Sequence, residues 1–275
     1  MVNMPNCGCF HQYELESTAP GEYQFTASVE GQADLKSVLE SANLATSVSA
    51  GTSWFKTTIH LSGVTNGAAL TNFCNQLKSA IIVDLTPSLD FCHALGPYTV
   101  IDENNEFCRT DMGELVFLAK YRNDPEAAEE LASRLSGFID NHPGFKNVTM
   151  IATPPSSNPS RPNLVESWAK QLAARMGWNI LTATKTRLTP PQKEISEEDS
   201  EDDAKSRISS SMQVPTVRPG TEVLLLDDTI RSGGTLIELG RVLRQSGAAK
   251  TYGLSATKDA KFTNGGIDLS KGSWT

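Results

Sequence analysis

One stretch, Val223 to Thr235, constrains the fold of this chain more than any other. It reads Val-Leu-Leu-Leu-Asp-Asp-Thr-Ile-Arg-Ser-Gly-Gly-Thr. The continuous apolar run from Val223 to Leu226 lies between turn-forming residues, a pattern typical of a strand that is buried on both faces of a parallel sheet. Asp227 and Asp228 follow directly. They therefore stand at the carboxyl end of the strand, where open α/β sheets place their ligands.

The residues after the two acids predict a phosphate-binding loop that leads into a helix. Apolar residues recur at helical spacing at Leu236, Leu239, Val242 and Leu243, and Gly247 marks the end of that helix. A helix N-terminus offers free N–H groups and a positive dipole end, and glycines let a phosphate approach the backbone closely. The candidate phosphate-binding residues are Thr229, Ile230, Arg231, Ser232, Gly233, Gly234 and Thr235.

The two acids suit a different part of the same ligand. Carboxylates repel phosphate, but they accept hydrogen bonds from sugar hydroxyls and hold Mg²⁺ directly or through water. Asp227 and Asp228 are therefore candidate catalytic and metal-binding residues. The chain has no Gly-Lys-Ser/Thr sequence, which argues against a Walker-type nucleotide site.

Composition favours a globular protein of the cytoplasm. An apolar content of 39% supports an ordinary core, and no run of eighteen apolar residues predicts a membrane segment. The N-terminus lacks a basic segment followed by an apolar one. Five irregularly spaced cysteines fit reduced thiols better than a disulfide framework.

The net charge of −8 comes mainly from one segment. Seven acids fall within the ten residues from Glu194 to Asp203, and the rest of the chain is nearly balanced. The chain has no basic stripe, so direct binding of nucleic acid is not expected. Residues 185–212, which contain this run, hold few apolar side chains, and we interpret them as a mobile acidic loop, either a lid or a solvated segment.

The remaining segments predict alternating strands and helices. Residues 1–20 are expected to lack regular structure. Residues 23–85 predict strands at 23–29, 54–61 and 80–85 and helices at 35–44 and 68–77, which together form a small α/β unit. Further on we expect a helix from Pro125 to His142, a strand at 148–152, a helix from Leu164 to Met176 that Gly177 ends, and a strand at 178–183.

Two further groups of residues are candidates for binding. Thr153, Pro154, Pro155 and Ser156 form a polar loop after a predicted strand, and Arg161 follows it. Cys7-Gly-Cys9-Phe-His11 suggests part of a zinc site completed by Cys74, Cys92 or Cys108, although zinc knuckles usually space their first ligand pair more widely. An exposed N-terminal tail, with buried cysteines further along the chain, is the favoured alternative.

The segment from Val223 to Thr235 closely resembles the phosphoribosyl pyrophosphate (PRPP) motif of type I phosphoribosyltransferases. That motif has four apolar residues, two acids, three variable residues and then Ser/Thr-Gly-Gly-Thr, and each part matches in order. Three further blocks are similar to the ComF family, the competence-associated phosphoribosyltransferase-like proteins. They are Phe117 to Asp124, Thr153 to Asn163, and Arg187 to Gln192 with Arg207.

The resemblance implies an α/β fold with a parallel sheet flanked by helices over residues 106–275. The first 105 residues would form an additional small α/β region that serves as a substrate hood or an interaction domain. The implied reaction is Mg²⁺-dependent displacement of pyrophosphate from PRPP by a nitrogen acceptor. In that reaction Thr229 to Thr235 would hold the 5′-phosphate, and Asp227 and Asp228 the ribose. The residues implied on the pyrophosphate side are Thr153, Pro154, Pro155, Ser156, Arg161, Lys185 and Arg207, with Arg187 as a further catalytic residue.

Two other functions stay open at this point. The acidic run lies where many phosphoribosyltransferases have a basic catalytic lid, which suggests a PRPP- or nucleotide-binding regulator without turnover. A ComF-like accessory factor for DNA uptake, acting through a protein partner or as a homodimer, is the other alternative. Arg231 stands where phosphoribosyltransferases that act on 6-oxopurines carry an aspartate, which exchanges a proton with the purine. A guanidinium stays charged and cannot do so, so the resemblance implies an acceptor other than hypoxanthine or guanine. A loop arginine that contacts phosphate or solvent is the alternative interpretation of this residue.

Overall fold

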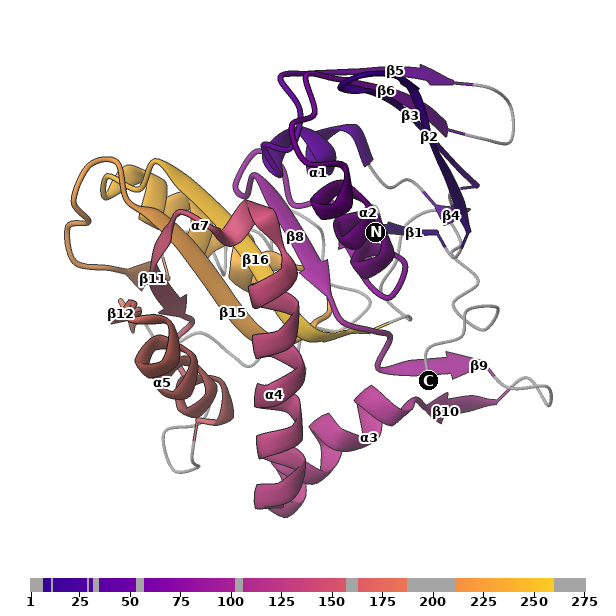
Figure 1. Cartoon of the computed structure of the whole chain (residues 1–275). Coiled ribbons are helices and arrows are strands. Elements are labelled where there is room, and N and C mark those ends of the chain that lie inside the picture. The colour runs from indigo at the N-terminus through magenta and orange to yellow at the C-terminus, as the bar shows by residue number, and fades with distance from the viewer. Residues whose placement is uncertain are drawn as a thin grey trace, which may run out of the picture.

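The computed structural model describes residues 7–10, 12–28, 30–31, 35–52, 57–101, 106–156, 163–186 and 211–259. Its centre is an eight-stranded sheet with helices on both faces (Figure 1). The strands in spatial order are β12 (Asn179–Thr182), β11 (Val148–Thr153), β15 (Glu222–Ile230), β16 (Lys250–Lys258), β8 (Phe91–Ala94), β7 (Ile81–Val83), β1 (Cys7–Cys9) and β4 (Glu30–Gly31). The first five are parallel, and the last three add antiparallel pairs. The expected α/β fold class is confirmed.

Strand β15 is buried on both faces, as its apolar run predicts. Leu224 and Leu226 belong to the core that α4 (Pro125–Asn141) and α5 (Leu164–Met176) cover. Val223 and Leu225 belong to the core on the opposite face, beneath α7 (Gly234–Gln245) (Figure 1). The strand runs four residues beyond Leu226, because β16 continues to pair with it as far as Ile230.

A smaller antiparallel sheet precedes the central one in the chain. Its strands in order are β2 (Tyr13–Ala19), β3 (Glu22–Ala27), β6 (Thr57–Ser62) and β5 (Ser47–Thr52). Helix α1 (Leu35–Ser41) packs against β5, and α2 (Gly67–Leu77) follows the sheet. The predicted strands at 23–29 and 54–61 and the predicted helices at 35–44 and 68–77 are therefore present with small shifts at their ends.

The prediction that residues 1–20 lack regular structure is wrong. Residues 7–9 form β1, which pairs with β7 inside the central sheet, and residues 13–19 form β2. Cys7 and Cys9 are buried there, so the expected exposed N-terminal tail is also wrong for these two residues. A three-residue strand has too short an apolar pattern to be recognised, and pairing with β7 supplies the energy that local propensity does not.

The first 105 residues contribute to both sheets. Strand β8 pairs in parallel with β16, so Phe91 lies beside Tyr252 and Ala94 beside Ser255. The expected division between residues 105 and 106 thus does not coincide with a gap between sheets. The small antiparallel sheet, by contrast, is built entirely from residues that precede Gly63.

Shorter elements connect the larger ones. They are the hairpin of β9 (Thr99–Ile101) and β10 (Phe107–Arg109), helix α3 (Asp111–Phe117), the π-helix η1 (Leu118–Arg122), the 3₁₀-helix η2 (Pro143–Phe145), and the strand pair β13 (Thr184–Lys185) and β14 (Met212–Gln213). Within the described ranges, no helix has both the length and the apolar character needed to cross a membrane.

Candidate functional site

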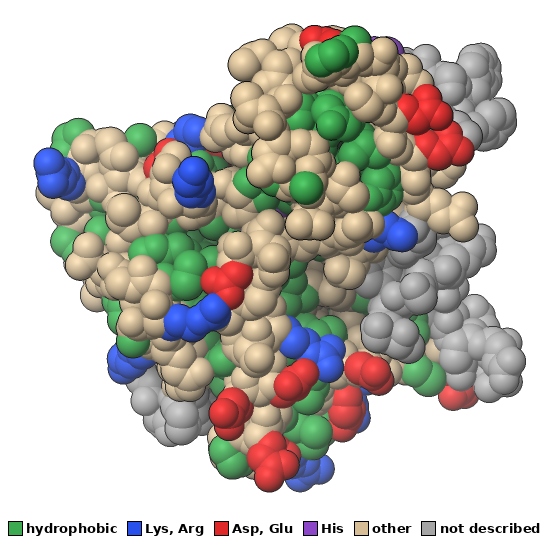
Figure 2. Space-filling view, viewed as in Figure 1, with side chains coloured by type: hydrophobic (Ala, Val, Ile, Leu, Met, Phe, Trp, Pro, Cys, Tyr) green, Lys and Arg blue, Asp and Glu red, His purple; other side chains and the backbone are tan. Residues whose placement is uncertain are grey.

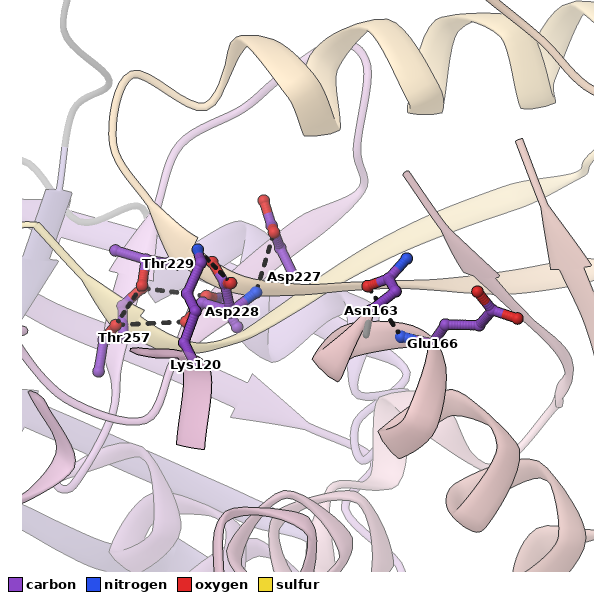
Figure 3. Close-up of polar contacts among 8 residues, drawn as sticks. Lys120, Asn163, Glu166, Asp227, Asp228, Thr229 and Thr257 are labelled. Atoms are coloured by element: carbon purple, nitrogen blue, oxygen red, sulfur yellow. Dashed lines mark hydrogen bonds and ion pairs between the residues drawn. The ribbon is translucent and has the colours of Figure 1, made fainter. Parts of the chain in front are cut away.

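The two acids of β15 point to different sides of the strand. Successive side chains of a strand alternate between its faces, and in Figure 3 Asp228 faces Lys120 while Asp227 points away from it. The backbone N–H of Asp228 donates to Asp227 Oδ1 at 2.9 Å. This bond fixes the rotamer of Asp227 and leaves Asp228 free to bond elsewhere.

Lys120 is the partner of Asp228. Its Nζ lies 2.5 Å from Asp228 Oδ2, and the two side chains are 36% and 12% exposed. Lys120 belongs to η1, the π-helical turn between α3 and α4, which ends at Asn123 in the left-handed conformation with a φ of 54°. Single π-helical turns are common at functional sites because they redirect side chains out of the regular helical series. Here the turn aims an ammonium group at the end of β15.

Burial and neighbouring charges shift the pKa values of this group. Burial, and then the adjacent carboxylate of Asp228, raise the pKa of Asp227 from 3.8 to about 7. Burial lowers the pKa of Lys120, but its ion pair with Asp228 outweighs that effect, so the net shift is upward. Asp227 therefore changes its charge near neutral pH, whereas Lys120 stays protonated.

The loop after β15 ends in a helix N-terminus. Gly233 is the residue before α7 and adopts a φ of 79°, and as a glycine it supplies no side-chain cap to the helix. A side chain at this position would also meet Leu85, because an added Cβ would lie 2.5 Å from Leu85 Cδ2. The first N–H groups of α7 thus keep their capacity to bind an anion, as the sequence predicts for Gly233, Gly234 and Thr235.

Residues of β16 support this loop from below. Lys258 is fully buried, and its Nζ donates to the carbonyl oxygens of Arg231 at 2.9 Å and Asp259 at 2.8 Å. Burial lowers the pKa of Lys258 to about 8. Thr229 shares a hydrogen bond of 3.0 Å with Thr257 (Figure 3), and the guanidinium of Arg231 lies 3.7 Å from the carboxylate of Asp259. Thr229 and Arg231 are therefore engaged with the end of β16.

The predicted pyrophosphate loop lies at the same edge of the sheet. Ala152 of β11 pairs with Leu225 of β15, so Thr153 to Ser156 follow β11 beside the two acids. Thr153 is fully buried, and its Oγ1 has no hydrogen-bond partner within the described part of the chain. Asn163, labelled in Figure 3, starts α5 near this edge by accepting a bond of 3.3 Å from the N–H of Glu166.

Lys185 lies at the base of the predicted acidic loop. It pairs with Met212 between β13 and β14, and the N–H of Thr186 donates to the carbonyl of Ser211 at 2.9 Å. The carbonyl of Thr153 accepts from the N–H of Ala183, which joins this base to the β11 end. Arg161, Arg187, Arg207 and the run from Glu194 to Asp203 lie outside the described residues.

The sequence predicts the two acids and the loop but not the residues that support them. Lys120 belongs to the Phe117 to Asp124 block without a role of its own, and no motif includes Lys258 or Thr257. Lys258 follows a segment of mixed small, hydroxylated and apolar residues, Thr251 to Thr257, and stands directly before an acid. A cation at the end of a second strand was the available signal.

The carboxylates of the site suit a Mg²⁺ ion that binds together with the substrate better than a metal ion held by protein ligands alone. The described residues contain no group of three or more His, Cys, Asp or Glu side chains that could hold an ion. Mg²⁺ typically keeps several waters and takes one or two carboxylates together with phosphate oxygens of the substrate, and Asp227 and Asp228 meet that requirement. Of the thiols considered for zinc, Cys7, Cys9, Cys74 and Cys92 are buried and Cys108 is exposed.

No protein-family model matches the chain, and no curated protein matches its sequence. Solved structures similar to it include adenine phosphoribosyltransferase from Leishmania tarentolae, with 11% identity, a TM-score of 0.37, and coverage of 54% of this chain and 77% of that one. Adenine phosphoribosyltransferase from Saccharomyces cerevisiae has 14% identity, a TM-score of 0.37, and coverage of 60% and 83%. Orotate phosphoribosyltransferase from Aeropyrum pernix has 15% identity, a TM-score of 0.32, and coverage of 64% and 80%.

Proposed function

We propose that the protein is a Mg²⁺-dependent phosphoribosyltransferase that binds PRPP at the carboxyl edge of β15. One observation carries this proposal: two carboxylates near the end of a buried parallel strand are followed within a few residues by Gly233 in the left-handed conformation and the N-terminus of α7. A sugar phosphate needs both parts, since the phosphate binds N–H donors and the hydroxyls bind carboxylates.

The 5′-phosphate anchors the substrate on the loop. The N–H groups at the start of α7 and the hydroxyls of Ser232 and Thr235 supply the donors. Lys258 has a supporting role, because its bond to the Arg231 carbonyl holds the loop in place beneath the ligand. Thr229 contributes through its backbone, since its hydroxyl is shared with Thr257.

The ribose lies over the two acids. Asp227 and Asp228 accept hydrogen bonds from its hydroxyls, and Mg²⁺ held by one of these carboxylates and by the pyrophosphate would neutralise charge on the leaving group. In the ligand-free protein Lys120 neutralises Asp228 instead. When PRPP binds, the ammonium group of Lys120 would turn from Asp228 to the negatively charged pyrophosphate.

The reaction breaks the bond between the anomeric carbon and pyrophosphate and forms a bond to a nitrogen of the acceptor. Its transition state has oxocarbenium character, so positioning and electrostatics supply most of the rate enhancement. The loop from Thr153 to Ser156, with Arg161, Lys185, Arg187 and Arg207, would surround the pyrophosphate and exclude water.

The acceptor is proposed to be a nitrogen compound other than hypoxanthine or guanine. Arg231 stands where 6-oxopurine enzymes carry an aspartate, and its guanidinium faces Asp259. A guanidinium cannot take up a proton from the acceptor. Assays of purified protein with PRPP and a panel of bases and amines test this point, and robust turnover of hypoxanthine that survives Arg231→Ala would contradict it.

The function itself is tested by calorimetric titration of Mg²⁺-PRPP into wild type and into the variant Asp227→Asn with Asp228→Asn. We expect the affinity of the double variant to fall at least tenfold, because the Asn oxygens still accept hydrogen bonds but without the negative charge, and for two bonds this loss is roughly 1 kcal/mol each. The fold should persist, since both side chains stand at a strand end. Unchanged affinity in a folded variant would remove the acids from the site.

A PRPP-binding regulator without turnover is the second candidate. The observation that favours it is the ion pair between Lys120 and Asp228, which already neutralises one of the two carboxylates available to Mg²⁺. Release of pyrophosphate separates the two candidates. A regulator would bind PRPP and release none with any acceptor in the panel.

A further inference from the structure

A cavity lies away from the strand-end site, between helices α2 and α4. Its volume is about 600 Å³, which lies within the range of small-molecule sites. Figure 1 shows both helices on the same side of β8, and in Figure 2 the area where α2 approaches α4 is mostly uncharged. None of the residues that line the cavity belongs to the phosphate loop, the acid pair or the Thr153 loop.

Primary amides dominate the polar lining of this cavity. Asn72, Asn75 and Gln76 come from α2, and Asn141 comes from the end of α4. Arg134 is the one charged residue among the described lining residues, and Phe138 contributes an apolar wall. The lining therefore offers donors and acceptors side by side, without a carboxylate that would repel an anion.

Several of these groups have hydrogen-bonding capacity to spare. The Gln76 amide nitrogen donates to the Phe138 carbonyl, but Gln76 Oε1 is buried with no hydrogen-bond partner in the described part of the chain. Asn75 Oδ1 accepts from the Tyr13 hydroxyl at 2.9 Å, which leaves its NH₂ group available. The Gln76 oxygen has almost no accessible surface, so Gln76 would have to turn toward the cavity to gain the partner that buried polar groups normally have.

Arg134 is only partly used. Its Nε lies 2.7 Å from Glu130 Oε1, and its Nη1 lies 3.3 Å from the Met112 sulfur. Within the described residues these contacts leave Nη2 without a partner. One guanidinium arm is thus available for an acceptor or an anionic group of a ligand.

We propose that this cavity binds a nucleobase-containing small molecule, with the amides of α2 contacting the edge of the base. An amide presents a donor and an acceptor next to each other, and Asn and Gln pair in this way with the edge of adenine. Phe138 and the apolar wall would accommodate the ring, while Arg134 would favour a ligand that also carries a phosphate. This site goes beyond the proposed transferase function and does not depend on it.

The experiment is a set of calorimetric titrations with adenine, adenosine and AMP, and with uracil, uridine and UMP. They are run on wild type, Asn72→Leu, Arg134→Leu and the double variant Asp227→Asn with Asp228→Asn. Asn72 and Arg134 are exposed helix residues, so their replacement should leave the fold intact. Gln171→Leu on α5, also exposed and outside the cavity, is the matched control.

We expect at least one of these compounds to bind wild type with a Kd below about 1 mM. That affinity should fall at least tenfold in Asn72→Leu or Arg134→Leu and stay unchanged in Gln171→Leu and in the acid double variant. The base, nucleoside and nucleotide arms then identify which form of the ligand binds. The proposal is overturned if none of the six compounds binds, or if binding survives both cavity variants. Loss of binding in the acid double variant alone would assign the ligand to the strand-end site, and failure of PRPP to bind would overturn only the transferase.

Discussion

At the scale of single residues, the ion pair between Lys120 and Asp228 is the main feature that the sequence left hidden. The two residues lie more than one hundred positions apart. The acids could be predicted because an apolar run ending in two carboxylates has a known place in a parallel sheet. Their partner Lys120 could not be predicted, because its orientation depends on the π-helical turn of η1. Such turns have no clear sequence pattern.

Replacing Lys120 by methionine should destabilise the protein more than an ordinary loss of a surface charge. Asp228 is only 12% exposed, and without Lys120 its carboxylate has no ammonium partner. We expect the free energy of unfolding to fall by about 1–2 kcal/mol, less than for a fully buried pair because Lys120 is partly exposed. Urea denaturation measures the change.

Lys170→Met is the matched control for this variant. Lys170 pairs with Glu166 on the surface of α5, where its side chain is 65% exposed. Exposed pairs of this kind contribute about 0.3–0.5 kcal/mol. Equal losses in the two variants would mean that the pair at β15 behaves as a surface salt bridge.

At the scale of elements, helices with clear end signals were predictable and short strands were not. Helix α5 runs from Leu164 to Met176 and ends at Gly177 with a φ of 70°, as its sequence predicts. Strands β1 and β8, of three and four residues, gave no periodic signal that could be separated from loop. Their position is set by neighbours in the sheet, since β-structure depends on packing more than on intrinsic preference.

Gly233 at the start of α7 gives a prediction at this scale. Gly233→Ala introduces a Cβ into a left-handed conformation, which costs about 1–2 kcal/mol. It also places that Cβ 2.5 Å from Leu85 Cδ2, and crowding of a packed core costs a further 1–3 kcal/mol, roughly. We expect a lower melting temperature and weaker Mg²⁺-PRPP binding, because the loop must shift.

Gly177→Ala separates these two contributions. Gly177 has a φ of 70°, and an added Cβ would meet nothing within 4 Å. This variant carries the backbone strain without the crowding, so it should unfold at a higher temperature than Gly233→Ala and bind PRPP as wild type does. If both variants lose the same stability, contact with Leu85 does not contribute to the requirement for glycine.

At the scale of the whole molecule, contacts between distant segments decide the architecture. Asp90 accepts from Arg244 at 2.6 Å and from the N–H of Thr251 at 2.8 Å, so it joins the loop before β8 to both α7 and β16. The parallel pairing of β8 with β16 does the same through the backbone. Such long-range pairs follow from the completed topology and from no local pattern, which explains why the first hundred residues were expected to form a separate region.

A buried histidine pair lies where β8, α4 and η2 meet. His142 Nδ1 accepts from the N–H of Gly144, so its proton sits on Nε2, which points to His93 Nε2 at 3.2 Å. Aromatic rings surround the pair, including Phe91 stacked on His142 with centroids 4.9 Å apart. Burial lowers the pKa of His93 from 6.5 to about 3, and burial followed by the charge of His93 lowers the pKa of His142 as well. Both rings are therefore neutral in the folded protein.

This pair should make the folded state sensitive to mild acid. Below pH 6.5 the unfolded chain takes up protons on both histidines that the folded protein does not bind, so stability falls as the pH decreases from about 6.5 towards 3. Each neutral histidine adds a slope of about 1.4 kcal/mol per pH unit to the free energy of unfolding.

In His93→Gln one of the two contributions is absent, and urea denaturation between pH 6.5 and 5 should show a slope lower by about that amount. The slope reports proton linkage whatever the absolute stability of the variant. His60→Gln, at an exposed position on β6, is the matched control for the substitution itself. A His93→Gln slope equal to that of wild type would mean that the imidazole binds a proton equally well in the folded and unfolded chain, which the aromatic enclosure and the hydrogen bond to His142 do not allow.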